Sequence, residues 1–166
     1  TIDWKSEHSE CVAALASGQA TIALLPQPFV TAACAQNEKL SIVLDLTKEW
    51  EALQGEGGSR LVTGVTVVRN EFLQENPPVI DTFLTEHAAS AAFANEKPEE
   101  ASQLIAAAGI IEKAPVAQKA LPYCNIVCLT GEEMKSALSG YLQVLFDQDA
   151  KSVGGKLPGD EFYYIQ

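Results

Sequence analysis

Residues 13–30, AALASGQATIALLPQPFV, decide the fold that this sequence predicts. The part before Gly18 has helical apolar spacing, and a glycine just past the last helical residue is a common way to end a helix. Residues 20–25 are short and continuously apolar, which is typical of a strand covered on both faces of a sheet. Pro26-Gln27-Pro28 follows as a turn, and Pro28 suits the first turn of the next helix. Helix, buried strand, turn and helix together indicate an open α/β sheet.

Two further segments have the composition of strands. Residues 40–46 (LSIVLDL) are mainly apolar, and residues 61–69 (LVTGVTVVR) are rich in β-branched side chains. From Asn76 onward the pattern becomes helical, with prolines at helix starts. We therefore expect an α/β fold, in which a short, mostly parallel sheet with flanking helices is followed by a helical C-terminal region. The predicted domains are residues 1–69 and 70–166.

Several local signals predict details of this organisation. Thr47 is expected to cap a short helix, and residues 130–133 (TGEE) have the spacing of a capping box. Residues 54–59 (QGEGGS) are expected to form a flexible loop. The aromatic residues 162–164 close the chain and are expected to dock back onto it.

Composition limits the function classes. The 166 residues carry a formal net charge of −11 and the sequence pI is about 4.5. Nucleic-acid-binding surfaces are basic, so this balance argues against a nucleic-acid partner. The four cysteines have no zinc or redox spacing, and the sequence has only two histidines. We expect no metal and no cofactor.

Candidate ligand-binding residues follow from the predicted sheet. Ligands of open α/β sheets bind beyond the carboxyl ends of strands, where Pro26, Gln27 and Pro28 stand. Gln27 has a structural alternative as part of a strand-to-helix turn. Thr63 and Gly64 offer a hydroxyl beside an accessible backbone, although a β-branched strand residue next to a bulge explains them as well. Trp50 follows a strand end and either lines the pocket or covers the sheet edge.

Four segments, taken in order, resemble the solute-binding proteins of ABC importers. The resemblance is to the branch for nitrate, sulfonates, taurine and thiamine-precursor pyrimidines. It extends over nearly the whole chain, and its third and fourth parts contain the runs Arg-Asn-Glu-Phe and Asn-Glu-Lys-Pro-Glu-Glu-Ala. The matching segments are residues 14–29, residues 40–46, residues 63–72 followed by 75–77, and residues 93–101.

The resemblance implies a type 2 periplasmic-binding-protein fold, of which this chain looks like roughly the C-terminal half. It implies a non-enzymatic, extracytoplasmic protein, periplasmic or lipid-anchored, that captures a small polar or anionic solute between two lobes for membrane permease subunits. Thr21 and Gln27 replace an aspartate and a glutamate that are usual in the family, which removes negative charge near the strand end. A half-protein would also expose a sheet edge, through which a homodimer could form.

Two alternatives stay open. The first is an enzyme of the same fold, related to thiamine-pyrimidine synthases, for which Cys124 and Cys128 are the candidate reactive groups near strand ends. The second is a ligand-sensing or interaction domain. Phe29 is a further candidate for stacking on a ligand, with a core position as the alternative, and His8 and His87 are expected on solvent-facing helix positions.

Overall fold

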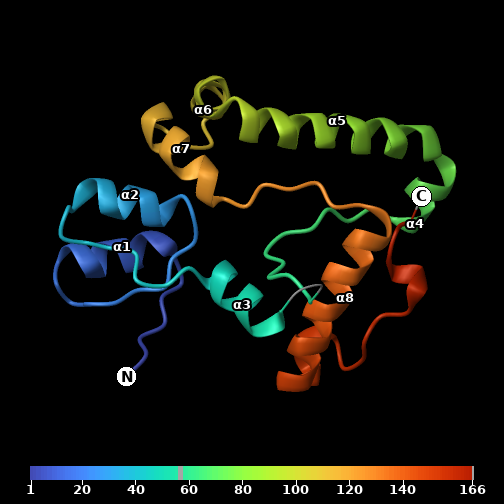
Figure 1. The fold of residues 1–166 in the computed structure, drawn as a ribbon, viewed down its shortest axis with the longest axis horizontal. Helices are drawn as coiled ribbons and strands as arrows, with labels where there is room; N and C mark the ends of the chain where they lie inside the picture. The colour runs from blue at the N-terminus through green and yellow to red at the C-terminus, as the bar shows by residue number, and fades with distance from the viewer. Residues whose placement is uncertain (56–57, 166) are drawn as a thin grey trace. The chain divides into compact units, whose positions relative to one another are not determined.

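The computed structural model describes residues 1–55 and 58–165, and its regular elements within these ranges are helices (Figure 1). In chain order they are α1 (His8–Ala16), α2 (Phe29–Gln36), α3 (Leu46–Gln54), α4 (Asn70–Glu75), α5 (Pro77–Glu96), α6 (Pro98–Ala107), α7 (Ala114–Ala120), η1 (Leu121–Tyr123), α8 (Gly131–Gln148), η2 (Ala150–Val153) and η3 (Asp160–Phe162).

The predicted α/β fold is wrong for this structure, because residues 1–55 and 58–165 contain no strand and no sheet. The segments expected as strands are irregular, and their apolar side chains are exposed. Ile22 is 81% exposed and Val67 is also 81% exposed. A type 2 periplasmic-binding-protein sheet is therefore not present in the described chain, and neither is the sheet edge that was expected to support a homodimer.

The physical reason is that a strand needs a partner. Apolar and β-branched composition favours an extended backbone, but a sheet forms only when neighbouring segments exchange hydrogen bonds. Residues 20–25 and 61–69 have such a composition. Within the described chain, however, they exchange no strand-pairing hydrogen bonds with another segment. Periodicity reports the local preference and contains no information about which segment lies alongside.

The helical predictions are largely confirmed. Prolines stand in the first turns of α6 and α7, as predicted, and Gly109, with φ of 70°, follows the end of α6. Two caps differ from the prediction. Asp45 rather than Thr47 caps α3, since its carboxylate accepts from the Thr47 and Lys48 backbone N–H groups at 3.1 and 3.5 Å. Thr130 stands at the N-cap of α8 but makes no capping bond with its side chain.

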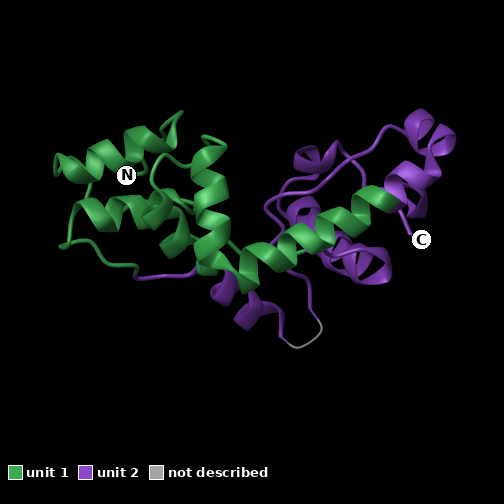
Figure 2. Cartoon of the chain, turned by 90° about the horizontal axis from the view of Figure 1, so that it is seen from above, with its two compact units in different colours: residues 1–42, 82–127 green, residues 43–81, 128–166 purple. Residues whose placement is uncertain are grey.

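The chain divides into two compact units (Figure 2). Unit 1 comprises residues 1–42 and 82–127, and unit 2 comprises residues 43–81 and 128–166. Each unit draws residues from both sides of Asn70, and α5 contributes its first residues to unit 2 and the rest to unit 1. The domain boundary near Asn70 remains a prediction. Of the loop predicted over residues 54–59, residues 56 and 57 lie outside the described chain.

Unit 1 has a core of small residues. α6 packs against α7, α7 packs against α2, and α2 packs against α1. Side chains as short as alanine allow helix backbones to approach closely, and the one polar residue of this core, Ser102, satisfies its hydroxyl by donating to the Glu99 carbonyl at 2.7 Å. The buried residues of this core are Ala14, Ala33, Ala91, Ala101, Ser102, Ala117, Ala120 and Leu121.

Unit 2 is organised around α8. The Trp50 indole N–H donates to the Ser59 carbonyl at 2.9 Å, and the Trp50 ring lies 5.4 Å from the Tyr141 ring, centroid to centroid. Gly140 of α8 is required by close packing, because a Cβ atom there would overlap the Ser59 side chain. The predicted docking of the aromatic chain end is confirmed for Tyr163, which is buried, whereas Phe162 is 57% exposed.

An ion pair joins the chain end to α8. The Lys135 ammonium lies 2.8 Å from the Asp160 carboxylate, and this hydrogen bond lowers the pKa of Asp160 and raises the pKa of Lys135. A carboxyl group with a lowered pKa stabilises the fold above its unfolded pKa, about 3.9, and loses that contribution as pH falls through the folded pKa. The raised lysine pKa gives a contribution that is lost only as pH rises above about 10.

We therefore expect Asp160→Asn to lower the melting temperature slightly at neutral pH, and we expect this effect to shrink as pH falls through the lowered pKa of folded Asp160, because wild-type Asp160 then becomes protonated as well. The effect is small because the pair is exposed to solvent. Thermal unfolding of both proteins from pH 3 to 8 measures it. Glu161→Gln, a charge removal at the neighbouring exposed residue, is the control, and an equal effect of this change would contradict the assignment.

Candidate functional site

Residues 26–28 precede α2, and the Gln27 side chain turns back onto that helix. Its amide oxygen accepts from the Thr31 hydroxyl at 2.8 Å and from the Thr31 backbone N–H at 3.3 Å. Gln27 thus satisfies a backbone donor of the first helical turn, which is the task of a capping group. This is the structural alternative considered for Gln27, and it occupies the carbonyl oxygen while leaving the amide nitrogen to donate. The Gln27–Pro28 peptide bond is cis.

Phe29, the next residue, contacts the neighbouring helix. Its ring centroid lies 4.9 Å from that of His8 in α1, with the rings inclined by 37°. The Phe29 ring therefore helps to pack α2 against α1. This favours a structural role for Phe29 over stacking on a ligand. His8 is exposed, as expected, whereas His87 is half-buried and stacks on Phe83 with a centroid distance of 5.6 Å.

The other predicted site residues belong to unit 2. Trp50 is half-buried and held by Ser59 and Tyr141, as described above. Thr63 and Gly64 are exposed, and a Cβ atom at Gly64 would meet no other atom of the described chain. No single unit contains all six predicted residues, since Pro26, Gln27 and Pro28 belong to unit 1. Their grouping into one ligand site remains a prediction.

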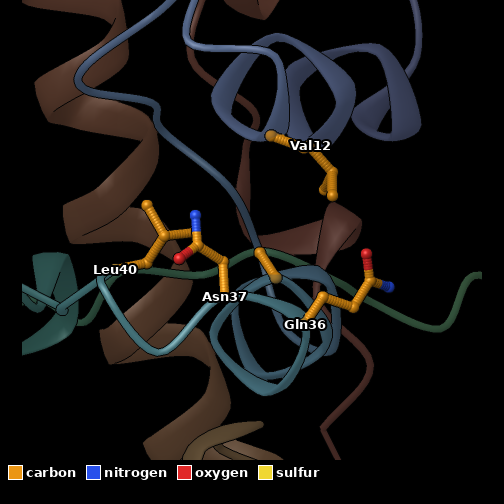
Figure 3. Close-up of a pocket in the computed structure, with 6 residues that line it drawn as sticks. Val12, Gln36, Asn37 and Leu40 are labelled. Atoms are coloured by element: carbon orange, nitrogen blue, oxygen red, sulfur yellow. The ribbon is translucent and has the colours of Figure 1, made fainter.

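A hollow in unit 1 is a concave feature that sequence reasoning missed (Figure 3). Its volume is about 210 Å³, and α1, α2 and the turn after α2 form its walls. Figure 3 shows Val12 on one side and the side chains of Gln36, Asn37 and Leu40 on the other. Ala16 and Ala33 complete the lining. We call this feature the α1–α2 hollow.

The α1–α2 hollow combines apolar walls with two amide side chains and has no charged lining residue. The Asn37 side-chain oxygen accepts from the Lys39 backbone N–H at 3.0 Å, which leaves the Asn37 amide nitrogen to donate. Gln36 is exposed at the rim. Mainly apolar walls with a few polar groups are usual in ligand sites, although most such sites are larger, about 300–1,000 Å³. The hollow therefore suits a small solute with acceptor oxygens.

No sequence pattern pointed to this hollow. Val12 and Ala16 are ordinary apolar positions of a predicted helix, and Gln36-Asn37 reads as a polar helix end. Asn37 was the available signal, because asparagine side chains bond to nearby backbone groups in turns. That signal predicts the turn and does not reveal the space behind it.

The structure describes four cysteines, Cys11, Cys34, Cys124 and Cys128. All four are free thiols, and the Cys124 thiol donates to the Ala120 carbonyl at 3.3 Å. Burial raises the pKa of Cys124. A reactive cysteine needs a lowered pKa because the thiolate is the nucleophile. The environment of Cys124 therefore does not favour a nucleophilic role.

Within residues 1–55 and 58–165, no three histidine, cysteine, aspartate or glutamate side chains gather in a way that could hold a metal ion. In the same part of the chain, no helix combines the length and the apolar character needed to cross a membrane.

Comparison with known proteins gives one informative likeness. No family model matches the chain, and no curated protein matches it. Among solved structures, an ABC transporter from Parabacteroides distasonis is similar, with a TM-score of 0.76 and 23% sequence identity. The match covers 98% of this chain and 55% of that chain, so this chain spans about half the length of its structural relative. The chain accordingly shares its fold with the matched part of that structure.

Proposed function

We propose that this chain belongs to the solute-binding component of an ABC transporter and captures a small polar or anionic solute for membrane permease subunits. The observation that carries the proposal is the fold shared with the Parabacteroides distasonis ABC transporter over 98% of this chain. Independent support comes from the sequence, because four segments resemble solute-binding proteins: residues 14–29, residues 40–46, residues 63–72 followed by 75–77, and residues 93–101. An extracytoplasmic location and the absence of catalysis are part of the proposal.

The α1–α2 hollow is the proposed place of solute contact in unit 1. Its volume of about 210 Å³ is below the range of about 300–1,000 Å³ that is usual for ligand sites, so it would admit a small solute or one end of a larger one. The donors at Asn37 and Gln36 would bind acceptor oxygens of carbonyl, carboxylate or sulfonate groups. Because no cation lines the hollow, specificity would come from hydrogen bonds rather than from charge pairing.

The enzyme alternative has weaker support. It depends on Cys124 or Cys128 as a reactive group, and burial raises the pKa of Cys124. The sensor or interaction alternative has no observation of its own in this structure. We therefore propose solute binding as the single function.

The test is isothermal titration with nitrate, taurine, alkyl sulfonates, amino acids and pyrimidines, followed by variants against the solute that binds. We expect Gln36→Leu to weaken binding about tenfold, since losing one hydrogen-bond partner costs about 1–3 kcal/mol. Gln103→Leu is the matched control, because Gln103 is an exposed glutamine of α6 in the same unit and does not line the hollow.

A second variant separates the hollow from the site predicted from the sequence. Gln27→Ala removes the residue predicted to specify the ligand, and Gln27 is not among the residues that line the hollow. Loss of binding in Gln27→Ala with normal binding in Gln36→Leu would move the site to residues 26–28. Failure of every solute to bind at millimolar concentration would contradict solute binding itself.

A further inference from the structure

The α1–α2 hollow presents a hydrogen-bond donor whose orientation is fixed by the backbone. The Asn37 side-chain oxygen accepts from the Lys39 backbone N–H at 3.0 Å. This bond distinguishes the two ends of the Asn37 amide, because only its oxygen can accept a hydrogen bond. The Asn37 amide nitrogen is left to donate, and in the view of Figure 3 it points to the side of the hollow on which Val12 lies. A solute in the hollow would therefore meet a donor at Asn37.

Gln36 supplies the complementary group. It is the residue before Asn37 and also lines the hollow, and in the view of Figure 3 its amide oxygen points to the same side as the Asn37 nitrogen. A donor beside an acceptor matches a solute group that carries a carbonyl oxygen and an N–H together, as a carboxamide does. A carboxylate or a sulfonate has acceptors alone at neutral pH, so it would leave the Gln36 oxygen without a donor.

The charges around the hollow do not favour an anion. None of the lining residues is charged. The charged residues within two positions of them in sequence are Glu10, Glu38 and Lys39, all of which are exposed and none of which lines the hollow. The chain as a whole carries a net charge of −11. An anion that entered the hollow would lose hydrating water without gaining a cationic partner, which is costly, whereas an uncharged solute avoids this cost.

The remaining walls suit a short aliphatic group. Val12 and Leu40 are half-buried, and Figure 3 shows them at separate places around the hollow. Ala16 and Ala33 also line the hollow, and their short side chains leave space. A volume of about 210 Å³ restricts the occupant to a small molecule or to the end of a larger one.

We propose that the α1–α2 hollow selects small uncharged solutes that carry a carboxamide group on a short aliphatic chain, and that it discriminates against anions of the same size. The Asn37 amide nitrogen donates to the solute carbonyl, the Gln36 oxygen accepts from the solute N–H, and the aliphatic chain contacts Val12 and Leu40. This inference rests on the proposed function, because it names the class of solute that the same hollow would bind.

Three probes of equal heavy-atom number test the proposal. Butanamide has the carbonyl and the N–H, butanoate replaces the amide by a negative carboxylate, and pentan-2-one keeps the carbonyl but has no N–H. Titration of the protein with each probe, followed by NMR of the methyl groups of Val12, Ala16 and Ala33, gives both the affinity and the place of binding. We expect butanamide to bind at least about tenfold more tightly than either of the other probes, since each of them leaves a polar group unpaired.

The outcomes separate this inference from solute binding itself. Butanoate that bound in the hollow as tightly as butanamide would overturn the proposal and leave solute binding by the protein intact. Pentan-2-one that bound as tightly as butanamide would show that the N–H is not recognised and would also overturn it. If no probe bound at millimolar concentration, the proposal would fail, and the isothermal titration with the wider panel would decide separately whether the protein binds a solute.

A filling substitution assigns the binding to the hollow. Ala16 is exposed and lines the hollow, so Ala16→Leu would occupy the space without replacing a buried side chain. We expect it to weaken butanamide binding at least about tenfold. Ala13→Leu is the matched control, because Ala13 is an exposed alanine of α1 that does not line the hollow. Unchanged binding in Ala16→Leu, or equal weakening in both variants, would overturn the proposal.

Discussion

Replacing Leu121 with alanine is expected to lower the free energy of unfolding of unit 1 by about 2–5 kcal/mol. Leu121 is 5% exposed and begins η1, which packs against α6 and α7. The surrounding core consists mostly of alanines, whose short side chains cannot move to fill the space that a leucine leaves. The loss therefore includes both the transfer of the side chain and the cavity left behind.

Leu104→Ala is the control for this prediction. Leu104 belongs to α6 in the same unit but is 62% exposed, so the same chemical change is expected to cost less than about 0.5 kcal/mol. Urea unfolding followed by far-ultraviolet circular dichroism measures both variants. Equal costs at the two positions would contradict the packing of η1 against α6 and α7.

Replacing Trp50 with alanine is expected to cost about 2 kcal/mol of the stability of unit 2. The change removes a tilted aromatic pair with Tyr141, worth about 0.5–1.5 kcal/mol, and a hydrogen bond to the Ser59 carbonyl, worth about 0.5–1.5 kcal/mol. Trp50→Phe keeps an aromatic ring and loses only the hydrogen bond, so it is expected to cost about half as much.

The matched control for Trp50 is the other tryptophan. Trp4 is 84% exposed near the start of the chain, and Trp4→Ala is expected to change stability by less than about 0.5 kcal/mol. Chemical unfolding of the four proteins gives the comparison. If Trp50→Ala were as harmless as Trp4→Ala, the Trp50–Ser59–Tyr141 contact would not stabilise unit 2.

The helices of this chain could be predicted because their signals are local. Proline at the start of α6, glycine after its end and apolar spacing between them act within a few residues of one another. The cap of α3 shows that local signals do not choose between two neighbouring capping residues. Asp45 and Thr47 are both good caps, and the structure uses the side chain two residues earlier.

Whether a sheet forms could not be predicted from local signals in the same way. Ile22, Leu24 and Val67 have the residue types of buried strands, yet within the described chain they are exposed and without strand partners. Strand pairing depends on segments distant in sequence, so composition fixes a preference for extended backbone and nothing about its neighbour.

The candidate site likewise has features that local sequence predicts and features that depend on contacts between distant segments. Gln27 could be singled out by its position after an apolar segment, and the structure then assigns its oxygen to Thr31. The α1–α2 hollow arises from how two helices meet around Val12 and Ala33, which no local pattern encodes.

We propose that this protein captures a small solute, and thermal unfolding of the protein in the presence of each solute of the panel tests this claim. A ligand present at 100 times its dissociation constant adds about 2.7 kcal/mol of stability, which corresponds to a rise of several degrees in melting temperature. We expect at least one of nitrate, taurine, an alkyl sulfonate, an amino acid or a pyrimidine to produce that rise in a saturable manner. An unchanged melting temperature with every solute at millimolar concentration would contradict the claim.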